Sequence, residues 1–376
     1  MLQSESDHIE IDYIEMYVPV AKPLVYWHEK ALGFSVSAYK GQDTGFPGIS
    51  SYVLRSNNIA LMITSSYPYC SETRGGDVDV FVKLNSCGVK RIAFRVDSVQ
   101  ESFLTALANG AIPIRFPYIV SDEFGSYEEA AIKLFDQNEI LFIDRSRYFG
   151  PFKPGYKTQN GKVDSGKQSF RSIDHIACEL RINETDHWTD YMKKSLGNKI
   201  VQRIGRSVEN LTGMIMNISQ TVNNEAMFVL TESEKHFQEA KVQQNIDRYG
   251  PGIHHLAFST NNIIDVIKEL RSRDVDFVGH PKAYYDQLRE KSDLQGIDID
   301  LLEEQGILID KEGDAYLLQK FIKPMGDRPY FFYEIVERIN GYNGFALNNI
   351  IALRKAEETQ ISHTEPGRGR LMETVC

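Results

Sequence analysis

Two stretches of the chain share one pattern of hydrophobic and polar positions. Residues 11–34 (IDYIEMYVPVAKPLVYWHEKALGF) and 173–197 (IDHIACELRINETDHWTDYMKKSLG) each read as a short apolar strand, a polar connector and an amphipathic helix. Gly33 and Gly197 come where each helix would end, and glycine commonly forms a helix C-cap. The pattern therefore predicts the same strand–helix unit twice.

Further matching segments extend this duplication. Residues 88–99 (GVKRIAFRVDSV) resemble residues 252–263 (GIHHLAFSTNNI), and both predict a strand that leads into a helix. In the later copy, apolar residues recur at helical spacing at Ile263, Val266, Ile267 and Leu270. The segments LFIDR (141–145) and EIVER (334–338) predict one closing strand in each half, with an insertion before the second of them.

The length and the linker composition indicate two domains. A chain of 376 residues is too long for one compact core. A stretch rich in Gly, Pro, Ser and Lys lies at 150–169, between the two copies. We expect an N-terminal domain over residues 1–155 and a C-terminal domain over residues 156–376.

Charge and hydropathy exclude several classes of function. A formal net charge of −10 argues against nucleic-acid binding, which needs a basic surface. No run of eighteen apolar residues and no apolar signal core are present, so we expect no membrane partner and a cytoplasmic location. The four cysteines are scattered without a Cys-x-x-Cys pair, which predicts free thiols.

The two halves differ in chemistry at three matched positions. The second half has His175, His255 and Glu334 where the first half has tyrosine, arginine and leucine. Two imidazoles and one carboxylate on separate strands of one curved sheet can converge on a point. This set matches the facial triad of non-haem Fe(II) oxygenases, so it predicts an iron site in the second half and no metal in the first.

Adjacent histidines at 254 and 255 raise a question of register. Alternation along a strand sends neighbouring side chains to opposite faces, so both cannot point directly at one site. His255 aligns with Arg91 of the first half and is the expected ligand. His254 is then expected to face the other way or to support the site.

These segments resemble the 4-hydroxyphenylpyruvate dioxygenase family, which includes the hydroxymandelate synthases. The resemblance rests on IDHIA (173–177), GPGIHHLAF (250–258) and residues 306–338, with YFGPFKPGY (148–156) resembling the interdomain segment. It runs from about residue 9 to about 358. It implies the α+β vicinal-oxygen-chelate (glyoxalase-like) fold, with paired βαβββ modules in two homologous domains and the metal site in the C-terminal one.

The resemblance also implies an activity. An Fe(II) enzyme of this kind binds an aryl-bearing 2-oxo acid through its carboxylate and keto oxygens, together with dioxygen. It then decarboxylates and hydroxylates that same molecule. The expected partners are this small-molecule 2-oxo acid and dioxygen, and a homo-oligomer is left open.

The family's substrate-contacting positions can be carried over by the same matches. Gln319 is expected to act in catalysis and to contact substrate. The remaining expected contacts are Phe321, Phe332, Phe345, Asn349, Ile350, Leu353, Met216 and Thr231. Residues 344–358 (GFALNNIIALRKAEE) resemble the family's closing helix. We expect this helix, around residues 346–358, to act as a lid that shields the reaction from water.

Three of these positions depart from the homogentisate-forming members. Met216 stands where a serine is usual, Thr231 where an asparagine is usual, and Ile350 where ring-hydroxylating members have phenylalanine. Fewer hydrogen-bonding groups for the phenol hydroxyl, together with a smaller side chain beside the aromatic ring, favour hydroxylation at the benzylic carbon, giving a (hydroxy)mandelate. The alternatives are homogentisate formation and a different 2-oxo acid.

Two alternative functions also fit these sequence features. A protein with this fold can bind a metabolite or a metal without turnover, and extradiol ring-cleaving dioxygenases share the triad. Gln319 and the closing helix favour the oxo-acid enzymes.

Overall fold

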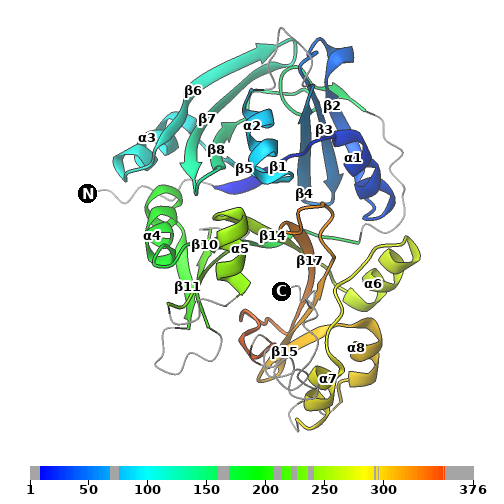
Figure 1. Ribbon diagram of the computed structural model, residues 1–376. Coiled ribbons are helices and arrows are strands. Elements are labelled where there is room, and N and C mark those ends of the chain that lie inside the picture. Colours follow the sequence, from blue (N-terminus) through cyan, green and yellow to red (C-terminus); the bar gives the residue numbers. More distant parts are fainter. Residues whose placement is uncertain are drawn as a thin grey trace.

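The computed structural model describes residues 9–67, 76–159, 169–205, 213–221, 227–235, 241–291, 294, 296–349 and 351. Figure 1 shows two curved sheets, one formed by the first half of the chain and one by the second, with helices between and beside them. Among the described helices, none is both long enough and apolar enough to cross a bilayer.

The first sheet has the order β6-β7-β8-β5-β1-β4-β3-β2-β9. Its strands are β1 (Glu10–Tyr17), β2 (Ser35–Lys40), β3 (Ile49–Ser56), β4 (Ile59–Ser66), β5 (Gly88–Arg95), β6 (Pro113–Asp122), β7 (Gly125–Leu134), β8 (Asn138–Asp144) and β9 (Lys157–Thr158). The accompanying helices are α1 (Ala21–Lys30), α2 (Gly76–Asn85) and α3 (Val99–Ala108), with a short 3-10 turn at Gln42–Thr44.

The second sheet has the order β11-β12-β13-β10-β14-β17-β16-β15. Its strands are β10 (Ile173–Leu180), β11 (Lys199–Ile204), β12 (Met214–Gln220), β13 (Met227–Ser233), β14 (Gly252–Ser259), β15 (Leu308–Glu312), β16 (Ala315–Phe321) and β17 (Phe332–Ile339). Its helices are α4 (Thr185–Leu196), α5 (Lys241–Tyr249), α6 (Ile263–Ser272), α7 (Lys282–Arg289) and α8 (Ile299–Gln305).

The two sheets have the same topology, apart from the short β9. In each half, two βαβββ modules meet through an antiparallel pair of their first strands, β1 with β5 and β10 with β14. Even the irregularities coincide, because the register shifts between Glu15 and Met16 in the first pair and between Ala177 and Cys178 in the second. The predicted duplication and the predicted fold class are confirmed.

Several local predictions can be compared with the observed elements. The apolar stripe expected on residues 263–270 is the buried face of α6. Gly197 is the C-cap of α4 in the left-handed conformation, as predicted. The C-cap prediction for Gly33 was wrong: α1 is capped by Ala31, and Gly33 (φ 75°) instead forms the turn that follows. The predicted insertion before the last strand holds α7 and α8.

One hydrophobic core joins the two halves. It includes residues from both sheets, such as Phe94 and Phe228, whose ring centroids are 6.3 Å apart. The buried His28 on α1 bonds through Nε2 to the Tyr333 hydroxyl on β17 at 2.8 Å. The sheets therefore pack through their helix-bearing sides, and their concave faces each have a separate cluster of buried residues.

The segment between the sheets bears on the domain boundary. Residues 157–158 still pair with β2 of the first sheet, and the second sheet begins at Ile173. We propose two domains that divide within this segment, close to the boundary expected at residue 155.

Candidate metal centre

Three side chains of the second half converge on its concave face. His175, His255 and Glu334 lie on the three adjacent central strands β10, β14 and β17. The register aligns Ala177 with His255 and Ala257 with Glu334, which places all three side chains on one side of the sheet.

The distances within this group suit a small cation. The ligand-type atoms of His175, His255 and Glu334 lie within 4.8 Å of one another, and in the described part of the chain no other such trio of His, Cys, Asp or Glu occurs. Glu334 Oε2 lies 3.0 Å from His175 Nε2 and 3.1 Å from His255 Nε2. Two imidazole nitrogens and one carboxylate oxygen therefore face a common point.

A buried ion pair orients the His175 ring. Asp174 Oδ1 accepts a hydrogen bond from His175 Nδ1 at 2.8 Å. The same carboxylate is held by Arg338, at 2.8 and 2.9 Å. Because Asp174 keeps a proton on Nδ1, Nε2 is the nitrogen that can lose its proton to an incoming metal ion, which is the arrangement that metal-binding histidines usually have.

The electrostatics of the trio are those of a compact ion-paired cluster. Burial raises the pKa of Glu334, but the two imidazoles outweigh it and lower the pKa to about 2. Burial lowers the pKa of His175, but Glu334 and Asp174 together raise it to about 9. For His255 burial dominates and lowers its pKa. The carboxylate is thus kept ionised in a buried place, where a divalent cation can replace the protons.

His254 lies beside His255 and does not point away from it. Their Nδ1 atoms are 3.1 Å apart, and the His254 ring meets Phe332 edge-on at 4.8 Å. The register shift in the β10–β14 pair breaks the strict alternation that predicts opposite faces. His254 therefore lies next to the trio without belonging to it, and its supporting role stays a prediction.

A chain of amides links the trio to the C-terminal segment. Gln319 Nε2 donates to Glu334 Oε1 at 2.7 Å, and Asn349 Nδ2 donates to Gln319 Oε1 at 2.9 Å. The Tyr284 hydroxyl then donates to Asn349 Oδ1 at 2.7 Å. The structure thus brings two predicted contact residues together: Gln319 bonds the Glu334 carboxylate, and Asn349 bonds Gln319.

Aromatic rings enclose the two imidazoles. Phe332 stacks on His255 at 4.9 Å with an interplanar angle of 20°, and the Phe321 ring lies 6.3 Å from His255. Phe345 meets the His175 ring edge-on at 5.8 Å. These three predicted residues therefore surround the site.

The other predicted contacts lie farther along the concave face or outside the described residues. Met216 and Thr231 are buried cross-strand partners on β12 and β13, on the same face as the trio. Ile350 and Leu353 lie outside the described residues, as does most of the predicted closing helix.

The sequence analysis missed a buried carboxyl group on the same face. Glu179 follows His175 by two strand periods, and it aligns with Thr231 across the sheet. Asn245 Nδ2 donates to its Oε1 at 3.1 Å, and His254 Nε2 is 3.8 Å away. The Tyr330 hydroxyl lies close enough to interact with this carboxyl group, but Glu179 Oε2 makes no hydrogen bond of standard geometry among the described residues.

The surroundings of Glu179 change its protonation. Burial raises the pKa of Glu179 to about 8, and the Asn245 amide, Lys241 and the Tyr330 hydroxyl offset it only in part. The period of two along the strand IDHIACEL places this carboxyl on the ligand face, so alternation from His175 could have identified it. Asp174 and Arg338 could not have been paired in this way, because their contact joins strands that are far apart in sequence.

The sequence of this chain is similar to those of known dioxygenases. Residues 172–301 match the Glyoxalase/Bleomycin resistance protein/Dioxygenase superfamily. The chain is 31% identical to a 4-hydroxyphenylpyruvate dioxygenase of Coccidioides posadasii, over 93% of this chain and 92% of the relative. It is 30% identical to one of Tetrahymena thermophila, over 97% of this chain and 92% of the relative.

A solved structure extends the likeness to the fold. A triple mutant of 4-hydroxymandelate synthase from Streptomyces coelicolor superimposes with a TM-score of 0.79 at 25% identity, covering 94% of this chain and 98% of the other. The similar fold and the sequence matches along almost the whole length lead to one conclusion. The chain belongs to the 4-hydroxyphenylpyruvate dioxygenase family of dioxygenase enzymes.

Proposed function

We propose that this protein is an Fe(II)-dependent dioxygenase that oxidatively decarboxylates and hydroxylates an arylpyruvate. The observation that carries the proposal is the buried group of His175, His255 and Glu334, with two nitrogen donors and one oxygen donor facing a common point. That donor set suits non-haem Fe(II) and leaves one side open for other ligands. When bound, the iron would chelate the 2-oxo acid and activate dioxygen.

The surrounding residues of the chain fix the ligands in place. Asp174, itself held by Arg338, keeps His175 in the tautomer that presents Nε2. Gln319 holds the Oε1 atom of Glu334, so that Oε2 faces the imidazoles. In this proposal Gln319 positions a ligand, which refines the catalytic role expected from the sequence.

The aromatic rings cover the metal centre. Phe332 and Phe321 cover the His255 side of the centre and Phe345 covers the His175 side. Their apolar surfaces keep water away from a reactive centre and provide flat faces against which an aryl group can pack.

Glu179 supports a polar contact for the far end of the substrate. Glu179 is buried on the ligand face with one oxygen that lacks a partner among the described residues. A hydrogen bond between this carboxyl group and a hydroxyl group of the ligand would stabilise the complex, because it supplies the partner that the buried oxygen otherwise lacks. The arrangement supports an arylpyruvate with a para-hydroxyl group, 4-hydroxyphenylpyruvate, as the substrate.

Two outcomes of the hydroxylation have support. Benzylic attack, giving a (hydroxy)mandelate, is favoured by Met216 and Thr231 on the concave face and by isoleucine at position 350. Attack on the ring, giving homogentisate, is favoured by the names of the full-length curated relatives, which are 4-hydroxyphenylpyruvate dioxygenases. We keep benzylic hydroxylation as the first proposal and ring hydroxylation as the second.

Product identification tests both the class and the position. The iron-loaded protein is incubated in air with 4-hydroxyphenylpyruvate and, separately, with phenylpyruvate, and the products are analysed by mass spectrometry and NMR. A mandelate-type product supports the first proposal. Homogentisate as the sole product supports the second and refutes the first, and turnover of neither acid refutes the proposed substrate class.

A further inference from the structure

A buried carboxylate on β15 contacts the C-terminal segment that follows β17. Asp310 is only 1% exposed. Its Oδ2 accepts a hydrogen bond from the backbone N–H of Asn348 at 3.1 Å, and its Oδ1 accepts one from Asn348 Nδ2 at 2.7 Å. The Tyr342 hydroxyl lies close enough to interact with the same carboxylate. Hydrogen bonds to a carboxylate are among the stronger ones in proteins, yet the proposed function gives Asp310 no role.

The bonds to Asp310 are made at the start of a helical stretch. Residues 347–349 are helical, and Ala346, which precedes them, has a positive φ of 51°. An alanine side chain cannot cap a helix, and positive φ is unfavourable for a residue that has a Cβ atom. Asp310 supplies a cap from another strand, because its negative charge lies against the free N–H groups of the first turn. The conformation of this turn therefore depends on contacts from outside the segment, and Asp310 makes one of them.

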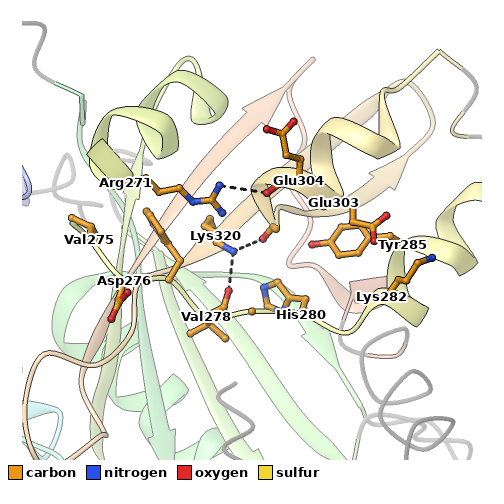
Figure 2. Close-up of a pocket in the computed structure, with 13 residues that line it drawn as sticks. Arg271, Val275, Asp276, Val278, His280, Lys282, Tyr285, Glu303, Glu304 and Lys320 are labelled. Atoms are coloured by element: carbon orange, nitrogen blue, oxygen red, sulfur yellow. Dashed lines mark hydrogen bonds between the residues drawn. The ribbon is translucent and has the colours of Figure 1, made fainter. Parts of the chain in front are cut away.

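The strand that bears Asp310 is itself fixed at its start. Lys320 on β16 and Arg271 on α6, which both line the pocket drawn in Figure 2, bind the turn between α8 and β15. Lys320 Nζ donates to the carbonyl oxygen of Gly306 at 2.7 Å, and the Arg271 guanidinium donates to that of Gln305 at 3.0 Å. From there β15 pairs with β16 along its whole length. Asp310 is therefore a fixed point to which the C-terminal segment is bonded.

The segment bonded to Asp310 places two side chains at the metal centre. Phe345 precedes the helical turn, and its ring lies 5.8 Å from the ring of His175. Asn349 follows the bonded residue directly, and its Nδ2 donates to the Gln319 amide, which in turn bonds a ligand carboxylate. A shift of this turn would therefore move an aromatic ring away from one ligand and an amide away from the group that supports another.

We propose that Asp310 is a positioning residue, which holds the C-terminal segment against the metal centre through Asn348. With the segment in place, Phe345 covers the His175 side of the centre and excludes water from it. Loosening the bonds to Asp310 should leave the three metal ligands where they are but displace this cover. The effect on catalysis rests on the proposed function, whereas the contact between Asp310 and the segment does not.

Hydrogen exchange measures how firmly the segment is held, without turnover. The metal-free full-length protein is followed by mass spectrometry of a peptide that covers residues 344–351. In Asn348→Asp, two carboxylates face each other, and exchange of this peptide should quicken by about tenfold or more, the range for losing a charge-assisted hydrogen bond. Adding Asp310→Asn to this variant places a donor opposite an acceptor again, so exchange should return to within a few-fold of the wild type.

A matched control and a kinetic measurement complete the test. Asp298 caps α8 in the same half, since its side chain accepts a hydrogen bond from the backbone N–H of Leu301 at 2.9 Å. Asp298→Asn should leave exchange of residues 344–351 unchanged. In the iron-loaded protein, Asn348→Asp should lower kcat with 4-hydroxyphenylpyruvate by about tenfold or more, because a displaced cover misplaces the reacting groups. Its affinity for Fe(II) should change by no more than a few-fold, and the double variant should recover kcat.

Three results would overturn the inference. The first is equal exchange of residues 344–351 in the wild type and in Asn348→Asp. The second is exchange in Asn348→Asp that Asp310→Asn does not slow, which would show that the two side chains do not act as a pair. The third is an unchanged kcat in Asn348→Asp despite faster exchange, which would refute the positioning role. Each would leave the proposed dioxygenase function untouched, because that function is tested by product formation in the wild type.

Discussion

The two concave faces of this protein are built on the same strand order but are filled in opposite ways. In the first half, Tyr13, Arg91 and Leu141 occupy the positions that match His175, His255 and Glu334, as the strand registers show. Arg91 is buried and bonds to Glu15 at 3.0 Å and to Glu139 at 2.7 Å. A fixed guanidinium therefore occupies the region where the second half has an imidazole.

The interdomain segment completes the filling of the first face. Tyr148, Phe152 and Tyr156 pack into its buried cluster, and Tyr156 bonds Ser51 at 2.8 Å. Lys153 of the same segment is 3.3 Å from the Tyr13 hydroxyl and 3.7 Å from Glu129. The chain's own cations and aromatic rings thus fill this face.

The comparison separates what the fold requires from what the chemistry requires. Both halves must bury the same sheet surface, and each does so with a continuous hydrophobic core on the helix side. The concave faces differ, and the difference is one of charge. In the first half, arginine and lysine form ion pairs with the buried carboxylates. In the second half, the Glu334 carboxylate faces two imidazoles instead. The first half should therefore bind no metal, because protein cations already neutralise its acids.

The largest expected effect comes from removing a ligand of the second face. Glu334→Gln should lower kcat by about a thousandfold or more, because the neutral amide neither binds Fe(II) strongly nor balances its charge. His254→Ala is the matched control, since this ring lies beside His255 without belonging to the trio. Oxygen uptake with 4-hydroxyphenylpyruvate measures both variants, and comparable activity of Glu334→Gln and the wild type would refute the assignment.

The first face should respond to the loss of its cation by losing stability. Arg91→Met leaves Glu15 and Glu139 buried with one fewer partner, which should lower the free energy of unfolding by about 3–5 kcal/mol. Arg181→Met removes an arginine whose side chain is 46% exposed and whose partner Asp136 is 44% exposed, and it should cost about 1 kcal/mol or less. Urea unfolding of the two variants gives the comparison. Equal losses would show that the first face does not depend on the buried cation.

The residues that orient the ligands should have intermediate effects on the metal. Asp174→Asn removes the carboxylate that holds His175 Nδ1 and should weaken iron binding by about 10–100-fold. Gln319→Leu should act in the same range through Glu334 Oε1. Competition with a chelator of known affinity measures both, and unchanged affinity in both variants would show that these contacts only stabilise the fold.

Burial of Glu179 should make the stability of the folded protein depend on pH. Its pKa is raised to about 8 in the folded protein, above the ordinary value of 4.5, so the folded state binds more protons between these pH values. Stability contributed by the protonated group is therefore lost as the pH rises from about 4.5 to 8. Glu179→Gln should raise the free energy of unfolding at pH 8.5 by up to about 4 kcal/mol and have little effect at pH 4.5.

The same residue should govern the preference for a hydroxylated ring. In Glu179→Leu, the ratio of kcat/KM for 4-hydroxyphenylpyruvate over phenylpyruvate should fall by about tenfold, the value of one buried hydrogen bond. Steady-state kinetics with both acids measure this ratio. An unchanged ratio would place the para-hydroxyl group away from Glu179.

How far the sequence predicts this molecule depends on whether a feature is local or repeated. The duplication predicts the strand–helix units, and the contrast between its copies predicts that residues 175, 255 and 334 come together, because matched strands must occupy matched places. The role of Lys153 in the first face was not predicted, since it depends on where the linker folds back. The position of His254 was also uncertain, because a register shift between β10 and β14 cannot be read from either strand alone.

The most direct test of the account is an anaerobic titration of the metal-free protein with Fe(II) in the presence of 4-hydroxyphenylpyruvate, followed by the visible charge-transfer band of the iron–oxo-acid chelate. The account predicts that the band saturates at one iron per chain, is lost in His255→Ala, and is retained in Tyr13→Phe, which alters only the first face. Saturation at two irons per chain, or an undiminished band in His255→Ala, would contradict it.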